Sequence, residues 1–246
     1  MYVLGIETTG PVGSVAVMNE KGQVVSRKTS EKMSHLRELT SMTEEIFREM
    51  GIKASNLGLI TVSIGPGSFT GIRIGVTTAR TLAQALKIPC KGVSSLEIFR
   101  EKTIMGNTNY TGKGAAIIYN ARRGQVYGAV YGPRSLEILP PGPYMLEDVL
   151  DAVSSQEDRE DFIFYGDGVD AYADRLEGLA LSEEDDRYPT AAMVARLGRK
   201  RFDEEGDDGY ENLLPDYMRI AEAEQKLRDG TLQRMQEEKK KRYEGN

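Results

Sequence analysis

The residues whose types and spacing most suggest chemistry form the glycine-rich run Gly65-Pro66-Gly67-Ser68-Phe69-Thr70-Gly71. Its glycines permit backbone conformations closed to other residues and let a helix N-terminus lie close to the end of a strand, a geometry that suits an anion. The spacing differs from the dinucleotide fingerprint, in which the third glycine comes one residue sooner, and from a P-loop, in which a Lys-Ser/Thr pair follows the last glycine. A phosphate cradle and a tight connection between strand and helix are therefore equally good interpretations.

Acidic and hydroxyl side chains at two strand ends are the other candidates for binding a nucleotide or a metal. Glu7 and Thr8 follow the apolar run 2–6, a position suited to holding a phosphate or a metal-bound water. Asp167 lies in a second strand-end glycine turn. The structural alternative is that Thr and Gly favour turns, and that a lone carboxylate at a strand end is usually solvated. These three residues and Gly67 are the candidate cofactor-binding residues, but we expect no cofactor on the isolated chain.

The chain contains one histidine and one cysteine, which restricts catalytic chemistry. His35 has Leu39 four residues on, not a second ligand, so we interpret it as a capping or packing residue. Cys90 follows a proline in an apolar context with no histidine nearby in sequence, so we expect a buried, unreactive thiol. A His-based metal cluster is impossible with one imidazole, and we expect no bound metal.

The composition narrows the class of protein. The chain has 246 residues, enough for one large domain or two small ones, and a formal net charge of −6. That charge gives no general attraction to nucleic acid, so an RNA contact would have to come from a local basic patch or a partner. No stretch reaches the ~18 apolar residues of a membrane span. With a single cysteine and no leader-like N-terminal segment, the chain is expected in the reducing cytoplasm.

Hydrophobic periodicity and turn residues predict two related halves. The first half opens with an antiparallel meander, and the second repeats strand, turn and strand over 115–131, which indicates two α/β lobes. Ser34 is expected to cap a helix over 35–50 that Gly51 closes. The polar run 102–112 reads as a loop between the halves, and a proline-rich run at 140–143 leads to a helix ending near Val153. The remaining predicted elements are strands at 2–6, 14–18, 23–27, 59–64 and 162–165, a short strand from 88, and helices ending near 86, at 171–176 and at 190–203.

These elements give the expected domain organisation. We expect an N-terminal lobe over 1–105 and a C-terminal lobe over 106–220. The last segment of the C-terminal lobe either stays in that lobe or packs on the first lobe. From 221 to 246 the tail is almost wholly charged and carries Lys239-Lys240-Lys241-Arg242. We interpret this tail as a solvated helix or disordered chain rather than a binding arm.

Two helices of the first half have more apolar surface than one contact requires. The helix over 35–50 adds Leu36, Thr43 and Phe47 to an already apolar sector. The helix after the glycine run places small and apolar residues toward the core. A second stripe beside that face consists of Ile74, Thr78, Thr81 and Ala85. These seven residues predict a partner interface, although a helix wedged between two elements of its own domain would look the same.

Taken together, these stretches resemble the TsaB (YeaZ) family of accessory subunits of bacterial tRNA threonylcarbamoyladenosine biosynthesis. The most specific match is the run from Gly65 to Gly75. Supporting matches are Gly92-Val93-Ser94-Ser95-Leu96-Glu97, Ala121-Arg122-Arg123-Gly124-Gln125-Val126-Tyr127, Gly166-Asp167-Gly168 and Leu214-Pro215-Asp216-Tyr217-Met218-Arg219. The resemblance implies the actin-like ATPase fold, with two lobes that each have a β-meander sheet and flanking helices.

The chain departs from the family pattern at informative places. Glu7 and Asn120 stand where relatives commonly have Asp, and Gln125 where they have Glu, which weakens a metal or nucleotide role at these positions. The resemblance also implies a catalytic sister subunit, TsaD, with a His-x-x-x-His pair at the positions of Ser95 and Phe99. Neither side chain replaces a metal-binding imidazole.

The resemblance implies a non-catalytic scaffold in the complex that transfers threonylcarbamoyl to N6 of adenosine 37 in tRNAs reading ANN codons. Its implied partners are a TsaD-type catalytic subunit, a TsaE-type ATPase and, functionally, a threonylcarbamoyl-adenylate synthase, with tRNA reached through the complex and a homodimer as a further option. The alternative is a free-standing enzyme of actin-like fold, either a glycoprotease-like peptidase or an ATP-dependent kinase. No activated nucleophile is apparent around His35, and Glu7 and Asp167 are the one plausible acidic pair for a kinase.

Overall fold

The computed structural model describes residues 1–31, 34–105, 113–133 and 136–218, and residues 1–216 form one unit. The side chains of 35, 36, 101–105 and 185 lie outside the description, as do the tail from 219 and the stretch 106–112. Predictions made for His35 and Leu36 side chains and for the charged tail therefore remain predictions.

The first sheet holds five strands in the order β3-β2-β1-β4-β5. β1 pairs antiparallel with β2 and parallel with β4, so the sheet is mixed. Its register places Ile6 opposite Val62, which brings the ends of β1 and β4 to the same edge. The strands are β1 (Tyr2–Glu7), β2 (Ser14–Met18), β3 (Val24–Lys28), β4 (Leu57–Gly65) and β5 (Cys90–Ser94).

The second sheet repeats the topology of the first. Its order, β10-β9-β6-β7-β8, gives the same antiparallel meander followed by parallel strands when β6 is matched to β1 and β9 to β4. The internal repeat predicted from the sequence is thus confirmed. The strands are β6 (Gly114–Arg122), β7 (Gln125–Tyr131), β8 (Glu137–Met145), β9 (Phe162–Tyr165) and β10 (Ala180–Leu181).

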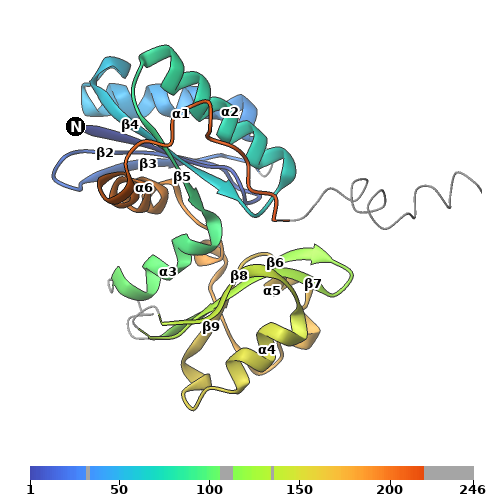
Figure 1. The fold of residues 1–246 in the computed structure, drawn as a ribbon. Helices are drawn as coiled ribbons and strands as arrows, with labels where there is room; N and C mark the ends of the chain where they lie inside the picture. Colours follow the sequence, from blue (N-terminus) through green and yellow to red (C-terminus); the bar gives the residue numbers. More distant parts are fainter. Residues whose placement is uncertain (32–33, 106–112, 134–135, 219–246) are drawn as a thin grey trace, which may run out of the picture. The chain divides into compact units, whose positions relative to one another are not determined.

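Three helices cover the first sheet. α1 (His35–Met50) and α2 (Phe69–Leu86) lie on one face and α6 (Ala191–Glu205) on the other, as Figure 1 shows. α1 ends where Gly51 takes a left-handed conformation (φ 65°) and Ile52 N donates to the Phe47 carbonyl at 2.9 Å. The residues of α2 that face the sheet are small or apolar, which lets the helix lie close to the strands: Gly71, Ile72, Gly75, Val76, Ala79 and Ala83.

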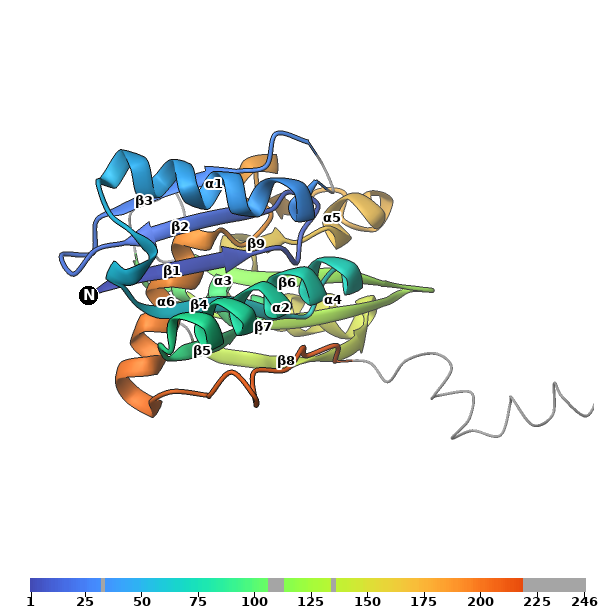
Figure 2. The same cartoon turned by 90° about the horizontal axis from the view of Figure 1, so that it is seen from above.

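The remaining helices complete the second lobe and the junction between the sheets. α3 (Ser95–Met105) contacts strands of both sheets, and α4 (Leu146–Ser154) packs on β7 and β8. The short α5 (Gly168–Ala171) follows β9, and Figure 2 shows both sheets from above. Single 3-10 turns occur at Ala54–Asn56, Arg159–Asp161, Ala173–Arg175 and Glu184–Asp186. No helix in the described part of the chain is long and apolar enough to cross a membrane.

Several sequence-based expectations for local structure were wrong. The run at 140–143 leads to a helix, α4, as expected, but its prolines themselves lie in a strand that was not predicted, β8, which tolerates them because it is an edge strand and needs fewer backbone donors. Residues 102–105 continue α3 instead of forming a loop. Ser34 is the N-cap residue of α1, as expected, but its side chain accepts no capping hydrogen bond and its Oγ donates to the Glu31 carbonyl at 2.8 Å. The helix expected at 171–176 is divided between the end of α5 and a 3-10 turn.

Candidate functional site

The glycine run joining β4 to α2 is a close-packing surface for the chain that follows β1. A Cβ atom at Gly67, Gly71 or Gly75 would lie less than 3.0 Å from Thr8 or Thr9. Ser68 N donates to the Thr9 carbonyl at 2.8 Å, and Thr8 Oγ1 donates to the Gly71 carbonyl at 2.7 Å. The glycines thus make room for protein atoms, and of the two interpretations of the run the structure favours the tight connection over the phosphate cradle.

Gly65, at the start of the run, is covered by the segment 206–216, which we call the C-terminal strap. Gly65 has φ +116°, and a Cβ atom there would collide with the carbonyl oxygen of Asp216. The backbone N–H of Asp216 donates a hydrogen bond to the Ile64 carbonyl at 2.8 Å. The other end of the strap is held by Asp208, which accepts from Lys91 Nζ at 2.7 Å and from Gly92 N at 2.8 Å. The strap therefore closes the β5 edge of the first sheet and the glycine run together.

Glu7 is buried, with 1% of its surface exposed, so of its two interpretations the solvated strand-end carboxylate does not hold. Its Oε1 accepts hydrogen bonds from Thr9 N and Thr9 Oγ1, both at 2.5 Å. Among the described residues no partner meets hydrogen-bond geometry for Glu7 Oε2 or Ser63 Oγ, although the Ser63 hydroxyl is near enough to lower the pKa of Glu7. Burial outweighs these interactions and raises the pKa of Glu7. Glu7 thus holds the Thr8–Thr9 turn against the glycine run.

A cavity of about 490 Å³, the interlobe cleft, opens between the ends of the two sheets. It brings together two of the four candidate cofactor residues, Gly67 and Asp167, whereas Glu7 and Thr8 do not line it. The lining residues are Thr9, Gly10, Pro11, Gly67, Ser68, Phe69, Thr70, Tyr119, Asn120, Arg122, Tyr127, Asp167 and Tyr188. Sequence reasoning missed Tyr119 and Tyr188, because no pattern distinguishes a cleft tyrosine from a core one. Phe69 and Arg122 belong to the family motifs, but the sequence alone did not assign them to a site.

Hydrogen bonds at the second-lobe wall of the cleft shape the β6–β7 hairpin. Asn120 N donates to Asp167 Oδ1 at 2.7 Å, and Asn120 Oδ1 accepts from Arg122 N at 2.8 Å and from Tyr172 Oη at 3.1 Å. Burial raises the pKa of Asp167. The two candidate carboxylates are therefore engaged in positioning backbone, and they do not form a pair of free metal ligands.

Two tyrosines of the cleft, Tyr119 and Tyr188, are poor acids. Tyr119 is 2% exposed, and burial, with the nearby Glu7 and Asp167 carboxylates, raises its pKa well above the ordinary value. Burial likewise raises the pKa of Tyr188 to about 12. No group of three or more His, Cys, Asp or Glu side chains suited to a metal occurs in the part of the chain that the structure describes. The cleft can bind and orient, but the described side chains offer no activated nucleophile.

Ser95 and Phe99, where the family resemblance implies a histidine pair in the sister subunit, are buried residues of α3. Ser95 is fully buried, and its Oγ donates to the Pro66 carbonyl in the glycine run. Phe99 is also fully buried, with its ring centroid 5.0 Å from that of Tyr165 in the second lobe. One turn of α3 thus contacts both the glycine run and β9 of the second sheet.

Cys90 is buried, as predicted, and burial with the nearby Asp207 and Asp208 carboxylates raises the pKa of its thiol to about 11. A thiol with that pKa carries little thiolate near neutrality. The cysteine therefore has the unreactive character expected from the sequence.

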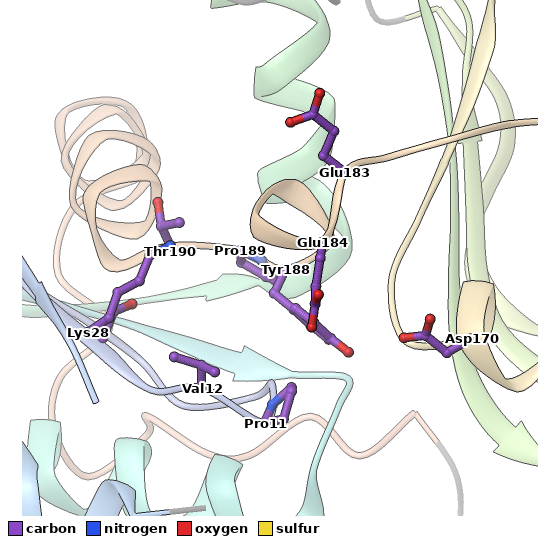
Figure 3. Close-up of a pocket in the computed structure, with 10 residues that line it drawn as sticks. Pro11, Val12, Lys28, Asp170, Glu183, Glu184, Tyr188, Pro189 and Thr190 are labelled. Atoms are coloured by element: carbon purple, nitrogen blue, oxygen red, sulfur yellow. The ribbon is translucent and has the colours of Figure 1, made fainter. Parts of the chain in front are cut away.

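A second hollow of about 330 Å³ adjoins the interlobe cleft and shares Pro11 and Tyr188 with it. Figure 3 shows Tyr188 and Glu184 pointing into the space between Pro11 of the first lobe and Asp170 of the second. Asp170, which lines the hollow, forms an ion pair with Arg187. The hollow is bordered by both signs of charge, from Lys28 and from Asp170, Glu183 and Glu184.

The duplicated mixed sheets, joined by a cleft at their strand ends, define an α/β protein of the actin-like ATPase fold. Comparison with known proteins agrees: YeaZ from Pseudomonas aeruginosa superposes with a TM-score of 0.71 at 26% identity, covering 88% of this chain and 99% of that one. A second structure, of a protein with similarity to peptidase YeaZ from Pseudomonas aeruginosa, gives a TM-score of 0.74 at 26% identity over 89% of this chain.

Sequence comparison identifies the family. The model of the family described as "TsaD: tRNA N6-adenosine threonylcarbamoyltransferase" matches residues 14–226. The Bacillus subtilis tRNA threonylcarbamoyladenosine biosynthesis protein TsaB is 31% identical, with 92% of this chain and 97% of that protein covered. The Escherichia coli TsaB is 28% identical, with 92% and 98% covered. The chain belongs to the TsaB (YeaZ) family and has a role in tRNA threonylcarbamoyladenosine biosynthesis.

Proposed function

We propose that this chain is a non-catalytic subunit that scaffolds a TsaD-type catalytic subunit during threonylcarbamoyl transfer to adenosine 37 of tRNA. The observation that carries the proposal is the state of Ser95 and Phe99. Their side chains are fully buried and contact Pro66 and Tyr165, which supports a packing role at the two positions where the family resemblance implies the sister's metal-binding histidines. The peptidase and kinase alternatives find no activated nucleophile or free acidic pair among the described cleft residues.

The proposed partner surface is the stripe on α1 and α2. The core face of α2 is buried, but the residues of the stripe are not. Half-buried are Thr43, Phe47, Ile74 and Thr78, and exposed are Thr81 and Ala85. Two apolar stripes on neighbouring helices suit a four-helix bundle with a related lobe, and the TsaD-type sister has the same predicted fold. Leu36 belongs to the same proposed surface.

The hydroxyl groups in this stripe favour burial against a partner. Thr43 Oγ1 donates to the Leu39 carbonyl and Thr78 Oγ1 to the Ile74 carbonyl, both at 2.7 Å. With their donors satisfied inside the helix, both threonines present methyl groups without an unpaired hydroxyl, which would be costly to desolvate. The same surface would serve a homodimer when the sister is absent.

We further propose that a TsaE-type ATPase joins this pair, that a threonylcarbamoyl-adenylate synthase supplies the donor, and that tRNA is bound by the assembled complex. The partner surface is tested by measuring association with the TsaD-type subunit for Ile74→Glu and Phe47→Glu, because an unpaired charge in a desolvated seam strongly opposes association. Each variant should lose the partner and keep the wild-type unfolding temperature, and Thr77→Glu, on an exposed face of the same helix, should keep both. Normal association, or an unfolded monomer, would contradict the assignment.

A further inference from the structure

Aromatic and cationic side chains of both lobes line the interlobe cleft or contact residues that line it. Phe69, in the first turn of α2, is 51% exposed, and the guanidinium carbon of Arg73 lies 3.9 Å from the centroid of its ring. Arg122 and Tyr127, from the β6–β7 hairpin, line the same cavity as Phe69. In both overall views the hairpin tip extends on the side where α2 begins (Figures 1 and 2).

The hairpin presents its arginines from a backbone that does not suit them. Arg122 and Arg123 have φ values of 67° and 55°, in the left-handed region that glycine and asparagine adopt more readily. Both side chains are exposed. The conformation is held by the Asn120 side chain, which accepts from Arg122 N, and by Asp167, which accepts from Asn120 N. Local turn preference does not explain two arginines here, so a function of their side chains is the better explanation.

This surface has the chemistry that recognises unpaired nucleotides. Exposed aromatic rings stack on bases, and arginines pair with phosphates and also stack on flat rings. Among the described residues that line the cleft, Asp167 is the one carboxylate, and its Oδ1 already accepts from the Asn120 amide. A chain with a formal net charge of −6 needs such a local patch for any RNA contact.

We propose that Phe69, Arg73, Arg122, Arg123 and Tyr127, here called the cleft-mouth patch, bind unpaired nucleotides of RNA. Bases stack on the aromatic rings, and the hairpin arginines contact phosphates. That the RNA is the tRNA undergoing modification rests on the proposed function. On α2 the patch is separate from the proposed partner stripe, because Arg73 and Ile74 point about 100° apart around the helix. RNA and the sister subunit can therefore be bound together.

The test measures binding of a fluorescent tRNA transcript with an ANN-reading anticodon to the complex of the full chain with its TsaD-type sister, over a series of salt concentrations. Arg122→Gln combined with Arg123→Gln should lower the slope of log affinity against log salt by roughly 1.4, for two lost single-strand phosphate contacts. Phe69→Leu should weaken binding at least about fivefold and leave the slope unchanged, as expected for lost stacking.

The matched control is Arg159→Gln combined with Arg196→Gln, which removes two exposed arginines away from the cleft and should change neither affinity nor slope. Wild-type affinity and slope in the patch variants would overturn the proposal, as would patch variants that lose the sister subunit instead of RNA, since the patch would then bind protein. If the wild-type chain does not associate with the sister, the proposed function fails. In that case the same titrations on the full chain alone still decide whether the patch binds RNA.

Discussion

Thr8 Oγ1 donates a 2.7 Å hydrogen bond to the carbonyl of Gly71, and the same hydroxyl oxygen would lie less than 3.0 Å from a Cβ atom at Gly75. Thr8 thus explains two glycines of the run that begins α2, Gly71 through its backbone carbonyl and Gly75 through its side chain. A third, Gly67, is explained by the neighbouring Thr9. The turn that in a nucleotide-binding protein would surround a phosphate here surrounds another turn of the same chain.

The first prediction concerns this contact. Gly75→Leu should destabilise the chain by ~1–3 kcal/mol, because the side chain would overpack the space held by Thr8 and Val62. Urea unfolding measures the change. The control, Thr77→Leu, adds the same side chain at an exposed position of α2 and should stay within about 0.5 kcal/mol of wild type. Equal stabilities for the two variants would show that the glycine is not required for packing.

The second prediction concerns the pH dependence that Glu7 causes. Its pKa is raised in the folded state, so between the unfolded value near 4.5 and the higher folded value the native state binds more protons than the unfolded state. The contribution of Glu7 to the free energy of unfolding is therefore fully present below about pH 4.5, and it falls as the pH rises from the unfolded pKa to the folded pKa. Glu7→Gln should remove the decline and become more stable relative to wild type as pH increases. Parallel stability curves for the two proteins would contradict this.

The third prediction concerns the C-terminal strap. Asp208→Ala should cost about 1–3 kcal/mol, because it leaves Gly92 N without its acceptor and removes one of the two carboxylates on the buried Lys91 ammonium. Asp203→Ala, which breaks an exposed i,i+4 pair with Arg199, should cost less than about 1 kcal/mol. Hydrogen exchange should also rise at Gly92 in the Asp208 variant alone. Unchanged exchange there would show that the strap does not protect the β5 edge.

The fourth prediction concerns ligands of the isolated chain. Calorimetric titration with ATP should give no micromolar binding, because Thr8 and Thr9 fill the glycine turn and Glu7 is engaged with Thr9. Elemental analysis should find no stoichiometric zinc or iron, since the described residues offer no group of three or more His, Cys, Asp or Glu side chains suited to a metal. Micromolar ATP affinity, or one metal ion per chain, would each contradict this part of the account.

Much of the fold could be predicted because the signals were local. The internal repeat, the strand at 162–165 and the boundaries of α1 and α2 follow from apolar periodicity and from glycines at turns. β8 was missed because prolines argue against a strand, and only its place at the edge of the sheet makes them tolerable. The position of a strand at the edge of a sheet depends on pairing with distant strands, so it could not be predicted from residues 140–143 alone.

The site was less predictable, for a related physical reason. Asp167 and Gly67 were found because strand-end glycine turns mark the edge where sheets meet ligands. The role of Glu7 was misjudged because its burial depends on Thr9, Ser63 and Tyr119, the last of them 112 residues away. Likewise, the glycine pattern cannot show whether a phosphate or Thr8 occupies the turn, because both require the same absence of side chains.

The central claim is that this chain supports a catalytic sister and performs no transfer itself. The most direct measurement is threonylcarbamoyladenosine formation on an ANN-reading tRNA transcript, with threonylcarbamoyl-adenylate supplied, by this chain alone, by the TsaD-type subunit alone and by both. The account predicts product with both subunits present, none from this chain alone, and loss of the stimulation when Ile74→Glu replaces the wild-type chain. Product from this chain alone, or full activity of the sister without it, would contradict the account.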